Sequence, residues 1–157
     1  MTMLRAIAYH PPGHGRDTWD LAVLRHDERW VRHGTIPLVH GDEVAVDFPT
    51  FVRMEQGGVL ELADGRHVEI IAGEEHLYEV RGRDAKHLMQ LCWRLGRRHA
   101  RTQIEPEWEG IGDRIVILRD PGLRALLVGL GATVTEISEP FAPLEDDAWL
   151  DETGGMA

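Results

Sequence analysis

The sequence has one cysteine, Cys92, in 157 residues, so no disulfide can form within the chain. A reducing compartment agrees with this count but does not follow from it. The opening residues, MTMLRAIAYHPPG, include no apolar run long enough for a signal peptide, and no segment approaches the ~20 apolar residues of a transmembrane helix. We therefore expect a cytoplasmic protein that does not enter a membrane.

Basic residues are also scarce. The chain has 17 Lys and Arg against 27 Asp and Glu, which gives a formal net charge of −10 at pH 7. A surface of this sign repels the phosphates of nucleic acids and of anionic membranes, so neither is an expected partner. Cations and basic protein surfaces are not disfavoured. The hydrophobic fraction of 43% is that of an ordinary globular protein.

The familiar catalytic and phosphate-binding motifs are missing as well. The sequence contains no GxSxG, no GxxxxGK[ST] and no GxGxxG after a predicted strand, and it lacks CxxC, HExxH and the calcium-loop pattern. Cys92 falls on the apolar stripe of a predicted helix, where a thiol is usually an inert small hydrophobe. These observations predict that the chain is not an enzyme. Of the nine histidines, all except His99 are expected to face solvent.

The first half of the chain is predicted to consist of strands and turns. Short runs such as LRAIAY, WDLAVL and EVAVDFP are separated by segments rich in Pro, Gly and Asp. Asp64 and Gly65 mark a tight hairpin between Leu60 and Ile70. No segment here has a helical period, so we expect a small β-sandwich or β-barrel domain over residues 1–74.

The second half alternates strands with two predicted helices. Asp84 is a candidate N-cap for a first helix whose end is predicted at Gly96. Asp120 followed by Pro121 marks the start of a second helix that ends at Gly131. The apolar positions, spaced by three and four residues, are Ala85, Leu88, Met89, Cys92 and Leu95 in the first helix and Leu123, Leu126, Leu127 and Leu130 in the second.

The predicted order of elements in this half is β-α-β-β-α-β, which is the ferredoxin-like arrangement. The expected fold class is therefore α+β, with an N-terminal all-β domain followed by a ferredoxin-like domain over residues 75–144. The free sheet face or a sheet edge of such domains often serves dimerisation, an expectation that rests on analogy. The last segment, residues 145–157, is acidic and rich in small residues, and it is expected to be disordered.

One histidine stands out in the stretch RLGRRHARTQI. His99 lies between the arginines at the end of the first predicted helix and the start of a predicted strand. Cationic neighbours disfavour a further positive charge, so this setting favours the neutral imidazole that metal ligation or a general-base role requires. A lone exposed histidine is usually structural or incidental, so a functional role for His99 needs further support.

Several longer stretches resemble the UreE family of urease accessory proteins. The stretch HLYEVRGRDAKHLMQLCWRLGRRHARTQIE is similar to the segment around that family's HLGNRH motif, and LRALLVGLGATVTEISEPFAPLEDDAW is similar to its second helix and the strand that follows. The stretches LRHDERWVRHGTIPLVHGDEVAVDFP and VLELADGRHVEIIAGEEHLYEV resemble its β-domain. The resemblance covers roughly residues 18–149, with the motifs in the family's order.

The resemblance implies a nickel metallochaperone. Such a protein forms a homodimer through the ferredoxin-like domain, binds Ni(II) at the dimer interface, and passes it with an accessory GTPase to the urease apoprotein. The motif's final histidine corresponds to His99, so a two-fold axis would pair His99 with its symmetry mate. Imidazole also binds Zn(II) and Cu(II) well, so these metal ions are candidates for binding in vitro. The family's β-domain binds protein partners, and this role is extended to residues 1–74, where Trp30 and Phe51 are candidate contacts.

The chain departs from the family's pattern at several positions. The motif's first histidine and its asparagine are replaced by Arg94 and Arg97, and the chain has no histidine-rich tail. His99 is therefore the only ligand carried over directly. The weaker candidates for auxiliary ligands are Asp120, Asp146 and Asp147.

Two other interpretations stay open at this point. The missing histidines favour a protein-interaction scaffold of urease maturation that binds little metal of its own. If the resemblance is discounted, a β-domain joined to a ferredoxin-like domain is compatible with a small-molecule-sensing regulator or a small hydrolase. That third interpretation requires a polar pocket with convergent titratable groups, which the sequence does not indicate.

Overall fold

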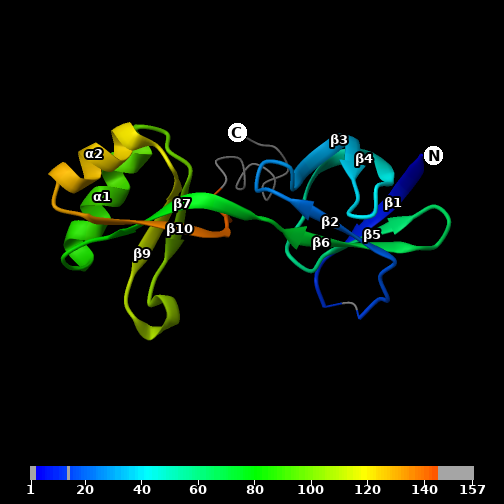
Figure 1. The fold of residues 1–157 in the computed structure, drawn as a ribbon, viewed down its shortest axis with the longest axis horizontal. Helices are drawn as coiled ribbons and strands as arrows, with labels where there is room; N and C mark the ends of the chain where they lie inside the picture. The colour runs from blue at the N-terminus through cyan, green and yellow to red at the C-terminus, as the bar shows by residue number, and fades with distance from the viewer. Residues whose placement is uncertain (1–2, 14, 145–157) are drawn as a thin grey trace. The chain divides into compact units, whose positions relative to one another are not determined.

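A computed structural model describes residues 3–13 and 15–144 of the chain, which divides into two compact units, Met1–Gly73 and Glu74–Ala157. The first unit contains β1 (Leu4–His10), β2 (Asp20–Leu24), β3 (Trp30–Pro37), β4 (Glu43–Arg53), β5 (Val59–Leu62) and β6 (His67–Ala72). The second contains β7 (Glu74–Arg81), α1 (Ala85–Arg97), β8 (Thr102–Glu105), the short 3-10 helix η1 (Trp108–Gly110), β9 (Arg114–Leu118), α2 (Pro121–Gly129) and β10 (Thr133–Pro140) (Figure 1). The predicted α+β class is confirmed, since the structure is mostly sheet with two longer helices. Within the described ranges, no helix is both long and apolar enough to cross a membrane.

The first unit is built on a six-stranded sheet with the strand order β2-β6-β5-β1-β4-β3. Strand β1 pairs in parallel with β4, and β2 pairs in parallel with β6, while the other neighbours are antiparallel. The N–H of Val39, which follows β3, donates to the carbonyl of Leu21 in β2 at 2.9 Å. This bond joins the two edges of the sheet, which curls around one core. Buried members of that core include Ala22, Leu24, Val44, Val46, Leu60, Leu62, Val68 and Ile70.

The predicted hairpin at Asp64 and Gly65 is present between β5 and β6. Leu60 lies opposite Val68 in the antiparallel pair, and the N–H of Gly65 donates to the carbonyl of Leu62 at 3.0 Å. Gly65 has a φ of 91°, which a residue without a Cβ adopts at no steric cost. The turn therefore depends on a glycine at position 65, which is one of the residues from which the sequence predicted the hairpin.

The second unit is a four-stranded antiparallel sheet with the order β10-β7-β9-β8 and two helices. Helix α1 connects β7 to β8, and α2 connects β9 to β10. Figure 1 shows both helices on the same side of this sheet. The buried side chains between helices and sheet are Leu88, Leu91, Leu95 and Leu127 from the helices and Tyr78, Val80, Ile115 and Ile117 from the strands. Each such burial contributes about 1.5–3 kcal/mol to the stability of the fold.

Both helices begin where the sequence predicts. The carboxylate of Asp84 accepts the N–H of His87 at 2.8 Å, and the carboxylate of Asp120 accepts the N–H of Gly122 at 2.9 Å. An N-cap of this kind contributes about 1 kcal/mol, because it satisfies a backbone donor that has no partner inside the helix.

The predicted end of the first helix at Gly96 is wrong. Helix α1 continues to Arg97 and is capped by Arg98. A glycine ends a helix when the chain needs a left-handed residue after the last turn. Gly96 is not among the residues with positive φ, whereas His99 has a φ of 54°. The helix therefore ends one residue later than predicted, and the left-handed position belongs to His99, three residues after Gly96.

The buried face of α1 also differs from the predicted one. Met89 is 71% exposed, although the spacing placed it among the buried positions. The prediction that every histidine except His99 faces solvent is wrong for His87, which is buried. The N–H of Arg83 donates to Nδ1 of His87 at 2.9 Å, and Nε2 of His87 donates to the carbonyl of Leu130 at 2.8 Å. Both ring nitrogens are satisfied, which removes most of the cost of burying an imidazole.

Candidate metal-binding site

The turn after α1 presents His99 at the surface. The N–H of His99 donates to the carbonyl of Gly96 at 3.1 Å, and the N–H of Ala100 donates to the carbonyl of Leu95 at 3.2 Å. These two hydrogen bonds form a Schellman motif, and His99 occupies its left-handed position. The residue as a whole is exposed. The imidazole is therefore attached to a hydrogen-bonded helix end and open to another molecule.

Helix α2 ends with the same motif and shows what this position usually requires. The N–H of Gly131 donates to the carbonyl of Val128, and the N–H of Ala132 donates to the carbonyl of Leu127, both at 3.0 Å. Gly131 has a φ of 89° and takes the left-handed position that His99 takes in α1. A residue with a Cβ is less stable there by about 1 kcal/mol. His99 is thus in a conformation of the kind that often occurs at functional sites.

The helix before this turn and the strand after it carry exposed apolar side chains. Trp93 of α1 is 59% exposed, and the guanidinium of Arg97 lies 4.8 Å from its ring centroid. Met89, one turn earlier on the same helix, and Ile104 of β8 are also exposed. Grouped apolar side chains of this size are typical of an interaction surface.

Cys92 lies in the same region and behaves as a small hydrophobe. It lines a pocket of about 170 Å³ together with Met89 and Ile104, so the apolar surface is continuous from α1 to β8. Burial raises the pKa of the Cys92 thiol above its ordinary value. Little thiolate is therefore present at neutral pH, which agrees with the prediction of an inert side chain.

The candidate auxiliary ligands are not assembled around His99 in the described structure. Asp120 uses its carboxylate as the N-cap of α2, where it accepts the N–H groups of Gly122 and Leu123. Asp146 and Asp147 lie outside the described residues. In residues 3–13 and 15–144, no group of three His, Cys, Asp or Glu side chains is arranged to hold a metal ion. That part of a single chain does not form a complete metal site.

A buried cation on the opposite face of the sheet was not foreseen from the sequence. Arg114 is 1% exposed and donates to Glu139 at 2.7 Å, to Glu105 at 3.0 Å and to Glu79 at 3.1 Å. The ring of Trp108 covers its guanidinium at 3.7 Å. Burial alone would lower the pKa of Arg114, but the hydrogen bonds to three carboxylates outweigh burial and raise it.

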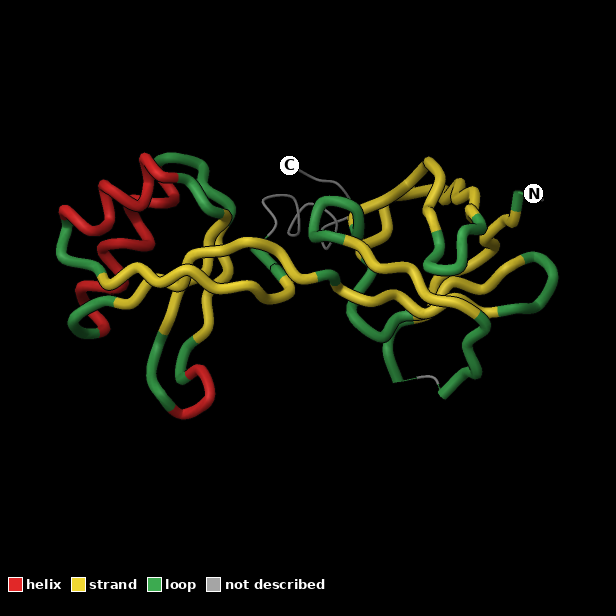
Figure 2. The backbone as a smooth tube through the Cα atoms, viewed as in Figure 1, coloured by secondary structure: helices red, strands yellow, loops and turns green. Residues whose placement is uncertain are grey.

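The Arg114 cluster holds a long connection against the sheet. Figure 2 shows the chain between β8 and β9 extending well beyond the ends of both strands. Trp108 belongs to this connection, while the carboxylates come from three different strands. The sheet order brings these side chains together, so no spacing along the chain could have indicated the cluster.

The first unit has its own buried carboxylate. Oδ1 of Asp20 accepts the N–H of Leu21 and a hydrogen bond from Nδ1 of His40, both at 2.7 Å. The Asp20 side chain is 1% exposed, whereas that of His40 is 73% exposed. A carboxylate in this position fixes the orientation of the ring. The pair also fastens β2 to the turn between β3 and β4.

The β3–β4 hairpin carries an exposed aromatic pair. The rings of Trp30 and Phe51 are stacked, with centroids 5.4 Å apart and planes inclined by 3°. The guanidinium of Arg53 lies 5.1 Å from the Trp30 ring centroid. Phe51 is exposed and Trp30 is partly exposed, so the pair contributes to the surface of the first unit.

The fold and the site together define a class of protein. The chain is a two-unit α+β protein with an exposed histidine at a helix end and exposed apolar side chains on the flanking helix and strand, features typical of a protein that binds other molecules. Residues 75–155 match the family model described as UreE urease accessory protein, C-terminal domain. Relatives called urease accessory protein UreE support the same assignment over most of the chain.

Three relatives define the extent of the similarity. The protein from Mesorhizobium japonicum is 51% identical over 123 residues, which is 78% of this chain and 60% of that protein. The protein from Brucella anthropi is 47% identical over 134 residues, which is 85% of this chain and 71% of that protein. The protein from Agrobacterium fabrum is 40% identical over 142 residues, which is 90% of this chain and 84% of that protein.

The chain belongs to the UreE family of urease accessory proteins. The resemblance noted in the sequence is therefore confirmed. The family consists of accessory proteins and not of enzymes, which confirms the prediction that this chain is not an enzyme.

Proposed function

We propose that the protein is a nickel metallochaperone that delivers Ni(II) for assembly of the urease active site. Membership of a family of urease accessory proteins supports this proposal. Two copies would form a homodimer, and His99 of each copy would bind the same Ni(II) across the two-fold axis. The metal would then pass, with an accessory GTPase, to the urease apoprotein.

The setting of His99 is the observation that carries the proposal. The side chain is exposed, sits on a hydrogen-bonded helix end, and occupies a position that glycine would fill at lower cost. A shared site needs a ligand of this kind, because one chain offers no complete metal site in its described part. A metal held by two imidazoles exchanges easily, which suits a carrier. Imidazole also accepts Zn(II) and Cu(II), so both are expected to bind in vitro.

The exposed apolar residues of the second unit support the dimer. Met89, Trp93 and Ile104 lie within one stretch that includes His99, and a second copy would remove them from water. The strand order β10-β7-β9-β8 with two helices on one side supports a ferredoxin-like domain over residues 75–144. We assign metal binding and dimerisation to that domain.

The remaining segments complete the proposal. Residues 1–74 would bind protein partners, which the exposed stack of Trp30 and Phe51 supports. Asp146 and Asp147 of the acidic segment 145–157 would supply auxiliary ligands, with Asp120 as a further candidate. The protein would act in the cytoplasm, where a chain with one unpaired cysteine is stable.

A scaffold of urease maturation with little metal binding of its own is the alternative function. The observation that favours it is the absence of a group of three ligands within the described part of the chain. The two proposals differ in what His99 does, so one experiment separates them.

We expect calorimetric titration of Ni(II) to give one metal per two chains. His99→Ala should abolish this binding while sedimentation still shows a dimer, because the apolar contacts remain. His76→Ala, which removes an exposed histidine of β7, is the matched control and should bind like the parent chain. Binding should also weaken on acidification, since a protonated imidazole cannot ligate a metal.

Two results would change the proposal. Unchanged Ni(II) binding by His99→Ala would place the site elsewhere in the chain. No binding by any of the three proteins would leave the scaffold function.

A further inference from the structure

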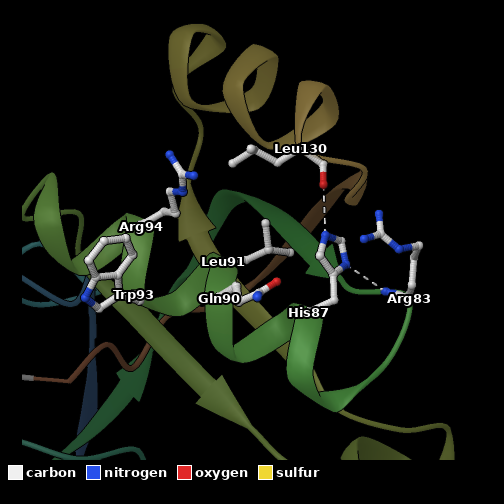
Figure 3. Close-up of a pocket in the computed structure, with 7 residues that line it drawn as sticks. All are labelled: Arg83, His87, Gln90, Leu91, Trp93, Arg94 and Leu130. Carbon is white, nitrogen blue, oxygen red and sulfur yellow. Dashed lines mark hydrogen bonds between the residues drawn. The ribbon is translucent and has the colours of Figure 1, made fainter.

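A second pocket lies on the other side of α1, between that helix and the end of α2. It has a volume of about 290 Å³, and its lining includes Arg83, His87, Leu91, Arg94 and Leu130. Figure 3 shows Arg83 and Arg94 at opposite ends of this pocket, with the other three residues between them. Met89 and Cys92 line the apolar pocket towards β8 instead, so α1 separates two surfaces of different character.

The two arginines of the pocket have no acidic partner in the described part of the chain. Neither Arg83 nor Arg94 forms an ion pair with a carboxylate there. Both residues are exposed, so their guanidinium groups can be reached from solvent. Arg81 and Arg114, by contrast, are paired with glutamates of the same unit. The guanidinium of Arg83 lies so close to the backbone of Gly131 that a Cβ there would overlap with it. The two cations are thus available for an external anion.

The surface between the two arginines offers little to a charged ligand. Both nitrogens of the His87 ring are already engaged, by the N–H of Arg83 and by the carbonyl of Leu130. Leu91 and Leu130 are apolar, and Gln90 is an uncharged polar residue that also lines the pocket. A ligand that carries negative groups at two places and an apolar group between them therefore complements the two arginines and the leucines.

The charge distribution favours the same kind of ligand. Residues 83–101 contain six cationic residues and one acidic residue, whereas the whole chain has a net charge of −10. This local excess attracts acidic groups that the rest of the surface repels, and it raises the rate at which such groups arrive.

We propose that this pocket binds an acidic peptide segment of a partner protein. Two carboxylates of the segment pair with Arg83 and Arg94, and an apolar side chain between them packs on Leu91 and Leu130. Arginine is suited to this contact, since its guanidinium binds a carboxylate through two parallel hydrogen bonds. The proposal does not depend on metal binding at His99.

The test uses a fluorescein-labelled peptide of alternating Glu and Leu and its counterpart with Gln in place of Glu. Fluorescence anisotropy with the full chain should show binding of the Glu peptide only, and added salt should weaken it. The double variant Arg83→Gln, Arg94→Gln should weaken binding by about tenfold, because an exposed charge pair contributes up to ~1 kcal/mol. Its thermal unfolding should match that of the parent chain.

The matched control is the double variant Arg98→Gln, Arg124→Gln. It removes the same charge from exposed positions of the same unit that do not line the pocket. We expect its affinity for the Glu peptide to stay within about twofold of the parent value, since Arg98 and Arg124 form no pairs with the bound peptide.

Equal weakening in both double variants would overturn the proposal, because it would indicate diffuse electrostatic attraction to the basic surface. Equal binding of the Gln peptide would also overturn it. If free glutarate displaced the peptide at the peptide's own affinity, the pocket would be a site for small anions and not for a peptide.

Discussion

At position 99 a side chain with a Cβ stands where the hydrogen bonds of a helix end favour glycine. Gly131 fills the equivalent position after α2, and the two turns have the same pair of backbone hydrogen bonds. The two helix ends of the second unit can therefore be compared directly, without reference to another protein. It shows that the identity of residue 99 is not explained by the stability of the turn.

We predict that His99→Gly raises the free energy of unfolding by about 0.5–1 kcal/mol, because it relieves the left-handed conformation of a residue with a Cβ. The same change should abolish the proposed binding of Ni(II). Urea denaturation of both proteins under identical conditions measures the difference in stability.

Arg98→Gly is the control for this prediction. Arg98 has a φ of −98°, so glycine relieves nothing there and should lower the free energy of unfolding. If the two glycine variants changed stability in the same direction, the conformation of His99 would not be a source of strain.

At the scale of elements, His87 connects the start of α1 to the end of α2. Its ring joins the backbone of Arg83, just before α1, to the carbonyl of Leu130, just after α2. We predict that His87→Leu lowers the free energy of unfolding by about 1–3 kcal/mol. It leaves the partly buried N–H of Arg83 and the partly buried carbonyl of Leu130 without their partner, and each such group costs up to about 1–2 kcal/mol.

Chemical denaturation measures this loss, and His76→Leu is the matched control. His76 lies exposed on β7, so the same chemical change there should alter stability by less than about 0.5 kcal/mol. Similar losses in the two variants would show that the bridge between the helices contributes nothing.

The ends of the helices show which parts of an element the sequence could predict. The N-caps Asp84 and Asp120 were predictable, because capping depends on a side chain and a backbone donor two or three residues later. The end of α1 was not, because Gly96 signalled a stop that the chain does not use. The burial of His87 was not predictable either, since its acceptor lies 43 residues away.

At the scale of the molecule, Arg114 and its glutamates link the stability of the second unit to pH. Burial alone would raise the pKa of Glu79, but hydrogen bonds from Arg81 and Arg114 outweigh it and leave the pKa below its ordinary value. A carboxylate whose pKa is lowered on folding stabilises the fold above its unfolded pKa of about 4.5. That contribution is lost as the pH falls through the lower, folded value.

We predict that Glu79→Gln lowers the free energy of unfolding near neutral pH and makes its decline below about pH 4.5 less steep. Unfolding measured across a series of pH values tests both effects. Glu136→Gln is the control, because that side chain is 64% exposed in its pair with Arg119 and should have little effect. Parallel pH profiles for the parent chain and Glu79→Gln would contradict the prediction.

Some features of the candidate site could be predicted from the sequence, and others could not. His99 was indicated by its setting and by the family resemblance, which both depend on contiguous residues. The Arg114 cluster and the Asp20–His40 pair bring together residues from different strands and turns, and the pocket with Arg83 and Arg94 adds the distant Leu130 to one face of α1. Only the order of the strands and the packing of the helices create them.

The left-handed conformation of His99 has a consequence for how such chains diverge. Glycine fits this turn better, so in a copy no longer selected for the proposed metal binding a change of His99 to glycine would stabilise the turn. Under the proposed function, a histidine kept at this position would record continued use of the imidazole. A duplicated gene that has lost this use should show the change at this position before the rest of the helix has altered.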